Sequence, residues 1–336
     1  MRVKRGLPLP STMVGGPWDS EKHVFVTSNS FLGRRIRSSE SVTPVKVVAG
    51  VYGNFGNQIL EAVCACYVAS HLGVQTVVVR DSGVFRVGVH QIGQVKLVAP
   101  EEKIPTAILS DAIRTISFLR SPEKHLAGAF MLNWIDSQYE LEAKQLATIT
   151  RDMPAGLSFE LSGEPLDPKE LTVSFRGGDA FSQRPNPTYG QPPLAYYQFV
   201  VESRDWTHVR VVSDDWQNPT LRPFLDWLDR RKTSFEYLEQ DWKSDVSLLY
   251  RSRSVVAPRG SFVPAIYAIS PFVEEMFHFG PVGYPISLTR VRTVQDIEME
   301  YSKAMIARDW TKSNEQLSLM VSFPKEGLRF VSSSHA

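Results

Sequence analysis

Short β-branched runs and longer apolar segments alternate along this chain in two separate series. The first series follows Pro44 and predicts a strand at residues 45–49, a glycine-rich turn, a helix at 58–72 and a strand at 75–79. Gly73, directly after the helix, is a typical helix stop. A strand, a helix and a strand in this order form a βαβ unit, which is the building block of a parallel sheet.

The second series runs from residue 171 to residue 269. It predicts strands at residues 171–175, 209–212, 234–238 and 254–257, and helices at 220–231, 244–251 and 262–269. This alternation indicates another doubly wound α/β layer. The predicted fold class is therefore α/β, with two Rossmann-like doubly wound domains that face each other across a cleft.

A stretch rich in glycine, proline and acidic residues, 163–168, separates the two series and marks the predicted domain boundary. The chain is accordingly divided into a basic N-terminal arm, an N-terminal Rossmann-like domain, a C-terminal Rossmann-like domain, and a C-terminal helix and tail, at residues 1–44, 45–167, 168–290 and 291–336. The last helix is predicted for residues 293–305, because Thr293 and Asp296 nearly form a capping box before an apolar face. Two further helices are expected near residues 106–119 and 139–151.

The composition is that of an ordinary globular protein, with 336 residues of which 43% are hydrophobic and 22% are charged. This length allows two domains with cores of their own. A net charge of +1 and a pI near 7.8 provide no overall field that would attract a polyanion, so nucleic acid is not an expected partner. Cys64 and Cys66 are the only cysteines, which excludes a disulfide framework or a zinc site and favours small buried side chains in a reduced compartment.

The chain contains no apolar run long enough for a transmembrane segment, and Met1 does not begin a charged-then-apolar signal peptide. We therefore expect a cytoplasmic protein. The first 44 residues are basic and contain serines, which leaves an organellar or membrane-surface location as the alternative.

A glycine-rich hexapeptide, Gly53-Asn54-Phe55-Gly56-Asn57-Gln58, joins the first predicted strand to the first predicted helix. Missing Cβ atoms and the free N–H groups of a helix N-terminus suit such a turn to bind phosphate. Its glycines do not match the G-x-G-x-x-G pattern of dinucleotide-binding enzymes, although Asp81 lies near the position where such enzymes hold a ribose. A nicotinamide or flavin site and a purely structural turn remain open alternatives.

A second strand-to-turn junction carries charge, in the segment Ser174-Phe175-Arg176-Gly177-Gly178-Asp179. Open α/β sheets bind ligands at strand ends where the strand order reverses. An arginine at such a place can bind a pyrophosphate with two N–H groups and neutralise the charge of a leaving phosphate. In the structural alternative, Arg176 pairs with Asp179 and only fixes the loop.

A third set of residues consists of Asp245 and, further along, Ser261 and Phe262. The two predicted helices that begin near them can border the same cleft. Asp245 could there accept paired N–H donors from a guanine edge, while Ser261 and the neighbouring N–H groups could bind a phosphate. Alternatively, Asp245 and Ser261 are helix caps.

In this order, the three segments resemble the fucosyltransferase superfamily, which includes the α-1,2-, α-1,6- and protein O-fucosyltransferases. The hexapeptide is similar to the family's G-x-[FL]-G-N-Q start, and residues 175–179 are similar to its H-x-R-x-G-D segment. Asp245 and the Ser261-Phe262 pair resemble its nucleotide-recognition aspartate and its late S/T-F pair. Residues 189–197 and 211–215 lie where members carry a helix ending in two tyrosines and then a strand ending in S-D-D.

The resemblance implies a GT-B fold, GDP-β-L-fucose as donor, a glycan as acceptor, and transfer with inversion and without a metal ion or other cofactor. It implies that Gly56 and Asn57 approach the pyrophosphate. Arg176 would bind the β-phosphate and assist its departure, a task that an arginine and helix N-terminal amides can perform without a metal. The residues that the resemblance assigns to the donor are Gly53, Phe55, Gly56, Asn57, Gln58, Arg176, Asp245, Ser261 and Phe262.

Two positions depart from the family pattern, because Ser174 replaces its histidine and Gly177 replaces a second basic residue. The departure at Ser174 favours one alternative, an inverting transferase that uses another nucleotide sugar. A second alternative is a non-catalytic nucleotide- or glycan-binding protein, against which the presence of Arg176 weighs. The expected catalytic residues are Arg176 and, as the preferred candidate for the base, Asp179. The other candidates for the base are Asp214 and Asp215.

Overall fold

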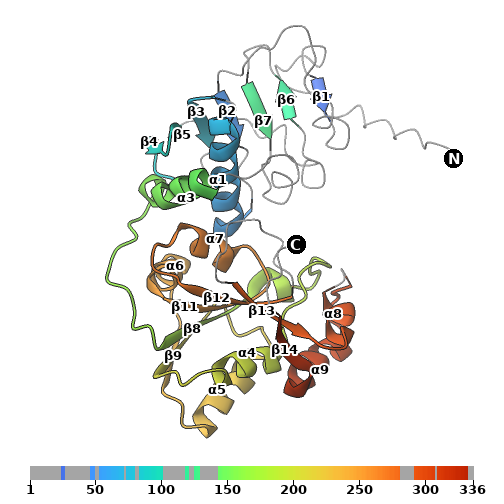
Figure 1. Ribbon diagram of the computed structural model, residues 1–336. Coiled ribbons are helices and arrows are strands. Elements are labelled where there is room, and N and C mark those ends of the chain that lie inside the picture. Colours follow the sequence, from blue (N-terminus) through green and yellow to red (C-terminus); the bar gives the residue numbers. More distant parts are fainter. Residues whose placement is uncertain are drawn as a thin grey trace, which may run out of the picture.

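The computed structural model describes residues 24–26, 46–49, 53–71, 73–79, 83–100, 118–120, 125–128, 143–280, 291–306 and 309–331. Within these residues the chain forms two separate seven-stranded sheets, each packed against helices (Figure 1). The predicted class is confirmed: the fold is α/β with two Rossmann-like units.

The first sheet has the strand order β1-β6-β7-β2-β3-β5-β4. Its strands are β1 (Val24–Val26), β2 (Lys46–Ala49), β3 (Thr76–Val79), β4 (Gly88–Ile92), β5 (Val95–Ala99), β6 (Phe118–Arg120) and β7 (His125–Gly128). Strands β7, β2, β3 and β5 are parallel, and β1, β6 and β4 join antiparallel at the two edges. Because β3 and β7 lie on opposite sides of β2, the strand order reverses at β2.

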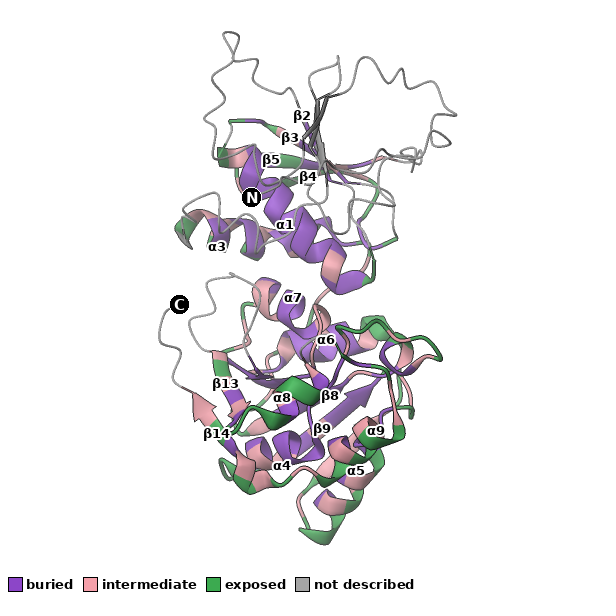
Figure 2. Ribbon diagram, turned by 90° about the vertical axis from the view of Figure 1, so that its right-hand side faces the viewer, coloured by how far each residue is buried: buried purple, intermediate pink, exposed green. Residues whose placement is uncertain are grey.

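Helix α1 (Phe55–His71) follows β2 and is buried along most of its length (Figure 2). It packs against β2, β3 and β5, against α3 (Ala143–Asp152), and against a helix of the second unit. A helix buried in this way needs apolar residues around its whole circumference. Cys64 and Cys66 are accordingly both buried and form no disulfide, as the sequence predicts.

The second sheet has the order β10-β9-β8-β11-β12-β13-β14. Its strands are β8 (Glu170–Phe175), β9 (His208–Ser213), β10 (Phe235–Leu238), β11 (Ser254–Ala257), β12 (Glu275–Phe279), β13 (Val291–Asp296) and β14 (Leu328–Val331). All are parallel except β14. Counted from β8, the parallel strands have the 3-2-1-4-5-6 order of Rossmann sheets, which places the switch point between β8 and β11.

Helices cover both faces of the second sheet. They are α4 (Leu194–Glu202), α5 (Leu221–Arg230), α6 (Trp242–Arg251), α7 (Phe262–Ile269), α8 (Glu300–Met305) and α9 (Asn314–Ser322). Short 3₁₀ turns occur at η3 (Met153–Gly156), η4 (Gly178–Phe181) and η5 (Lys325–Gly327). The buried residues of α6 and α7 belong to the same hydrophobic core as those of α1 and the first sheet. The two units therefore share a continuous core through the contact between α1 and α7.

The predicted helix at residues 293–305 is wrong in its first half. Val291–Asp296 is strand β13, which pairs with β12 and β14, and only Glu300–Met305 is helical. The residues of β13 alternate in burial with period two, which suits a strand, and two sheet partners outweigh the weak helical pattern. Asp296 still acts near a helix start, because its carboxylate accepts hydrogen bonds from the backbone N–H and hydroxyl of Ser302.

Most other predicted elements are confirmed to within a few residues, and β11 and α7 have the predicted bounds. Helix α1 begins at Phe55, so the prediction of a start at residue 58 is wrong. The predicted helix at 106–119 falls mainly outside the described residues, and its end belongs to β6. The predicted helix at 139–151 corresponds to α3, with residues 139–142 outside the described part.

Candidate functional site

Arg176 lies at the switch point of the second sheet. It follows β8 directly, and its Nη1 donates a hydrogen bond to the backbone carbonyl of Arg259, 3.2 Å away in the turn after β11. Gly260, at φ +141°, leaves room for this crossing, because a Cβ atom there would lie 2.6 Å from Arg176 Nη1. The guanidinium thus spans the gap between two neighbouring strand ends, where such sheets bind ligands.

Two further contacts orient the Arg176 guanidinium. Its Nη2 lies 3.0 Å from Asp179 Oδ1, and its Cζ lies 4.0 Å from the centre of the Tyr189 ring. The Arg176 side chain is 19% exposed, whereas that of Asp179 is 53% exposed. The loop-fixing ion pair is therefore present, and it leaves part of the guanidinium accessible to a ligand.

Asp215 explains the glycine after Arg176. A Cβ atom on Gly177 would lie 2.2 Å from Asp215 Oδ1. This carboxylate accepts hydrogen bonds from the backbone N–H groups of Gly178 and Gln217 and from the Gln217 side chain. Asp215 is thus a structural residue of the loop, and the second basic residue of the family pattern has no space at position 177.

Asp214 is the neighbouring carboxylate at the end of β9, and it is exposed to solvent. Surrounding protein raises the pKa of Asp214 by desolvation, while the Gly177 backbone N–H and the charge of Arg176 act in the opposite direction. Asp214 is therefore accessible to a ligand, and its raised pKa means that it holds a proton more tightly than an ordinary aspartate does.

Asp245 is buried in the first turn of α6, and it is not the cap of that helix. The cap is Asp241, whose side chain accepts hydrogen bonds from the backbone N–H groups of Lys243 and Ser244. Asp245 Oδ1 instead accepts a hydrogen bond from Gln240 Nε2 at 2.9 Å. Desolvation raises the pKa of Asp245 to about 6 against the opposing effect of this hydrogen bond, and the charges of Asp214 and Asp241 add to the rise.

The N-termini of α1 and α7 meet beside this region. A Cβ atom on Gly56 would lie 2.5 Å from the backbone carbon of Ser261 and 2.6 Å from the backbone nitrogen of Phe262. The rings of Phe55 and Phe262 lie next to each other, with centres 5.9 Å apart. Gly56 therefore allows the first unit to approach the backbone of the second, whatever its role toward a ligand.

The remaining hexapeptide residues shape the same junction. Gly53 has φ +77°, and its carbonyl accepts a hydrogen bond from Gln58 Nε2 at 2.6 Å. Asn57 is half-buried, and a Cβ atom on Gly53 would lie 2.8 Å from its Nδ2. The predicted cap role of Ser261 is only partly met, because Ser261 is the N-cap residue of α7 but its side chain makes no capping hydrogen bond. Ser174 is buried in β8.

The structure brings Arg176 and Asp179 to the edge where Ser261 precedes the start of α7, and Asp245 lies on the neighbouring helix of that edge. The sequence did not point to Gln240, which lies beside Asp245. It also did not point to Tyr189 and Gln191, which lie beside Arg176. The only signal for the latter two is the resemblance of residues 189–197, which gives no contact.

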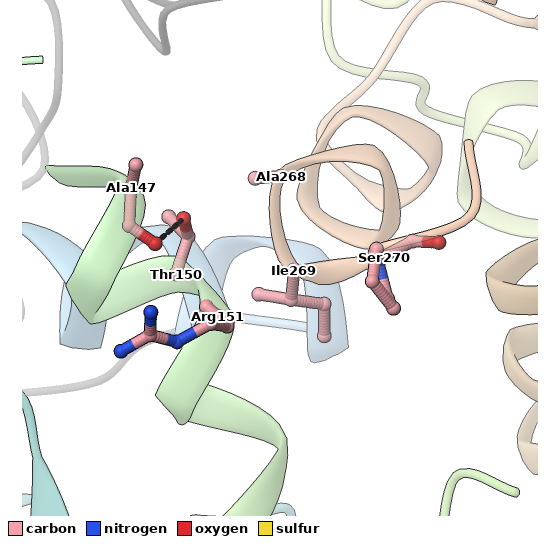
Figure 3. A pocket seen from close by; sticks show the side chains of 7 residues that line it. Ala147, Thr150, Arg151, Ala268, Ile269 and Ser270 are labelled. Atoms are coloured by element: carbon pink, nitrogen blue, oxygen red, sulfur yellow. Dashed lines mark hydrogen bonds between the residues drawn. The ribbon is translucent and has the colours of Figure 1, made fainter. Parts of the chain in front are cut away.

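Two pockets lie elsewhere. One, of about 240 Å³, is lined by residues 147, 150 and 151 of α3 and by residues 268–271 at the far end of α7 (Figure 3). The other, of about 570 Å³, lies at the amino ends of the second sheet's strands beside Arg204, Glu275 and Arg292. Neither includes Arg176, Asp245 or Ser261, so the candidate site is an edge of the sheet and not one of these pockets.

Among the described residues, no three His, Cys, Asp or Glu side chains are arranged to hold a metal ion. No helix in the described ranges is long and apolar enough to cross a membrane. The absence of a cofactor stays a prediction.

Comparison with known proteins gives distant structural likeness only. No known family's sequence profile matches the chain, and no curated protein sequence does. The crystal structure of POFUT1 in complex with GDP is 12% identical, with 71% of this chain and 99% of that chain covered and a TM-score of 0.41. E. coli heptosyltransferase WaaC with ADP is 8% identical, with 83% and 100% covered and a TM-score of 0.35.

A third similar structure is the iron-containing dodecameric glycosyltransferase TibC from enterotoxigenic E. coli H10407. It is 9% identical, with 73% of this chain and 62% of that chain covered and a TM-score of 0.35. TM-scores at this level carry no argument about function, so the proposals below rest on the residues of this chain.

Proposed function

We propose that this protein is an inverting, metal-independent glycosyltransferase that transfers L-fucose from GDP-β-L-fucose to a hydroxyl group of a glycan. One observation carries the proposal: Arg176 bridges the ends of β8 and β11 at the switch point, beside the α7 N-terminus. That terminus in turn contacts the N-terminus of α1 at Gly56. A guanidinium and unpaired helix amides at one place suit a diphosphate.

In the proposed reaction, the acceptor oxygen forms a bond to the anomeric carbon while the bond from that carbon to the β-phosphate oxygen breaks. The electron pair of the broken bond leaves with GDP. Arg176 and the N–H groups at the start of α7 would stabilise this growing negative charge, which is the main requirement of an oxocarbenium-like transition state. The acceptor hydroxyl gives its proton to a carboxylate, for which Asp179 remains our proposed base.

Asp245 supports a guanine nucleotide. Its carboxylate lies in a neighbouring helix of the same edge, and Gln240 donates to only one of its oxygens. A carboxylate can accept two N–H donors from the guanine edge, and adenine and uracil do not present such a pair. The remaining donor residues that we propose are Gly53, Phe55, Gly56, Asn57, Gln58, Ser261 and Phe262.

A thermal-shift series with GDP, UDP, dTDP, NAD and the corresponding sugar conjugates tests this proposal. We expect stabilisation by GDP and GDP-fucose, of about 2.7 kcal/mol at a ligand concentration one hundred times the Kd. Asp245→Ala should remove the preference for GDP over UDP. Stabilisation by UDP or dTDP sugars alone would indicate another nucleotide sugar, and stabilisation by NAD alone would contradict the transferase.

Turnover assays separate an enzyme from a binding protein. We expect release of GDP from GDP-fucose in the presence of a glycan acceptor, unaffected by EDTA, with a product of inverted anomeric configuration. Binding of GDP-fucose without turnover on any acceptor would favour the non-catalytic alternative. Comparison of Asp179→Asn with Asp214→Asn tests the base, because loss of the general base lowers turnover by about 10²–10⁴-fold and leaves GDP affinity unchanged.

A further inference from the structure

The chain segment after η4 folds back over Arg176. Tyr189 lies on this segment, and its ring centre is 4.0 Å from the Arg176 Cζ atom. A guanidinium at this distance from an aromatic face is attracted by the ring and held against it. The ring therefore fixes the side of the guanidinium that the hydrogen bonds do not.

Gln191 ties this segment to the turn after β11. Its Nε2 lies 2.9 Å from the carbonyl oxygen of Tyr189 and 3.3 Å from that of Arg259. The Arg259 carbonyl also accepts the hydrogen bond from Arg176 Nη1. The Gln191 amide and the Arg176 guanidinium thus share one acceptor, so a shift of the first would move the second.

Residues of the C-terminal part of the chain contact the segment that carries Tyr189 and Gln191. The Tyr301 hydroxyl donates to the Gln191 carbonyl at 2.7 Å, and Trp310 Nε1 donates to the Ala180 carbonyl at 2.7 Å. A Cβ atom on Gly190 would lie 1.6 Å from the Met305 carbonyl oxygen. These contacts leave the backbone of residues 189–191 little freedom to retreat from Arg176.

The ion pair to Asp179 is too exposed to orient the guanidinium alone. Half of the Asp179 side chain faces solvent, and exposed ion pairs hold long side chains only weakly. Catalysis by a charged group depends on its being oriented before charge develops on the leaving oxygen. The Tyr189 ring and the Arg259 carbonyl supply the further restraint on the guanidinium that the ion pair does not.

We infer that Tyr189 and Gln191 are positioning residues that hold Arg176 in the orientation needed to stabilise a leaving diphosphate. This inference rests on the proposed function. Tyr189 acts through its ring and not through its hydroxyl, and Gln191 acts through its Nε2 donor. Neither residue needs to touch the donor substrate.

The test compares Tyr189→Leu, which removes the ring, with Tyr189→Phe, which keeps it. We expect Tyr189→Leu to lower kcat by about 2- to 30-fold with little change in KM for the donor, and Tyr189→Phe to retain wild-type kcat. Phe330→Leu is the matched control, because its ring lies 5.6 Å from the Arg292 guanidinium at a place outside the site. Its kcat should not change.

A double-mutant cycle with Arg176→Ala separates positioning from general support of the fold. If Tyr189 acts through Arg176, Tyr189→Leu should cause no further loss of kcat once the guanidinium is gone. Equal losses with and without Arg176 would overturn the inference. So would a loss of kcat in Tyr189→Phe as large as in Tyr189→Leu.

Gln191→Met provides a second variant with a side chain of similar length. We expect a lowered kcat that Arg176→Ala again masks, with a melting temperature that shows the chain still folds. An unchanged kcat in Gln191→Met would remove Gln191 from the inference. If the wild-type protein transfers sugar but both mutant cycles are additive, only the positioning role is contradicted. If the wild-type protein neither binds GDP nor transfers sugar, the proposed function is contradicted as well.

Discussion

The two glycine-rich junctions of this molecule follow the same sequence plan and have different surroundings. Each follows a parallel strand at which the strand order reverses, β2 in the first sheet and β8 in the second. At the first junction, Gly56 lets α1 touch the backbone at the start of α7. At the second, Gly177 makes room for the Asp215 carboxylate beside Arg176.

The difference shows that a glycine after a strand indicates that another group packs closely against it, but does not indicate which group that is. The hexapeptide of the first junction contains no charged side chain, and its near neighbours are backbone atoms and aromatic rings. The second junction holds a guanidinium and three carboxylates within one loop and the end of β9. We therefore interpret the first junction as a joint between the two units that also borders the proposed donor site, and the second as the place of the chemistry.

Removal of the Arg176 guanidinium should have the largest effect. We expect Arg176→Ala to lower turnover by about 10²-fold or more, the usual cost of losing one group that stabilises charge in the transition state. Steady-state kinetics with GDP-fucose measure it. Arg231→Ala is the control, because Arg231 also forms an ion pair but on the exposed end of α5. Normal turnover in a folded Arg176→Ala protein would remove the charged junction from the mechanism.

A methyl group on Gly56 tests the joint. We expect Gly56→Ala to lower the free energy of unfolding by about 1–3 kcal/mol, because the added Cβ would overlap backbone atoms that cannot rotate away. Urea denaturation measures the change. At Gly156 an added Cβ would meet only side-chain atoms, the nearest being Leu97 Cδ2 at 3.1 Å, so Gly156→Ala is the matched control. Unchanged stability together with lost GDP binding would contradict the role of Gly56 in the joint and leave it only the proposed role toward the donor.

The same contrast explains how much the sequence could predict. Strands and helices of the second unit were predictable because buried parallel strands are short β-branched runs between amphipathic helices. Arg176 could be singled out because it follows a predicted strand in a glycine-rich turn, and Asp245 because it lies near the start of a predicted helix. Strand β13 was mistaken for a helix start, since its second partner, β14, lies far along the chain and leaves no local signal.

The contacts that define the site could not be predicted from the sequence. The approach of Gly56 to Ser261 depends on how two units pack, and a single sequence carries no information on that distance. The capping role of Asp241, in place of Asp245, depends on where α6 begins, and helix bounds are the least certain part of a sequence pattern. Tyr189 reaches Arg176 only through the loop that follows β8.

The pKa of Asp245 gives a pH-dependent prediction for the charged region. Only the ionised carboxylate accepts both guanine N–H donors, and its pKa is raised to about 6. We expect GDP to bind about tenfold more weakly at pH 5 than at pH 7. Calorimetric titration at several pH values measures this. In Asp245→Asn the remaining slope should be that of the phosphate alone, and an identical slope in both proteins would contradict the role of Asp245.

The raised pKa of Asp245 also lowers the stability of the folded chain at neutral pH. Because the folded chain holds the Asp245 proton more tightly than the unfolded chain does, ionisation of Asp245 costs stability as pH rises from about 4 to about 6. We expect Asp245→Asn to remove this cost, so the variant should be at least as stable as the wild type at pH 7.

Asp241, the N-cap residue of α6, lies four residues before Asp245, and its substitution should have the smallest effect on the protein. Its pKa is lowered, mainly by the backbone N–H groups of Ser244 and Lys243, so its contribution is present at neutral pH and is lost as pH falls through its folded-state pKa. Loss of a helix cap in Asp241→Ala should lower Tm by about 2–4 °C and leave GDP affinity unchanged. The two aspartates then have different roles: Asp241 caps the backbone of α6, and Asp245 binds the ligand. A larger loss of GDP affinity in Asp241→Ala than in Asp245→Ala would reverse these roles and move the proposed guanine contact from Asp245 to the N-cap residue of α6.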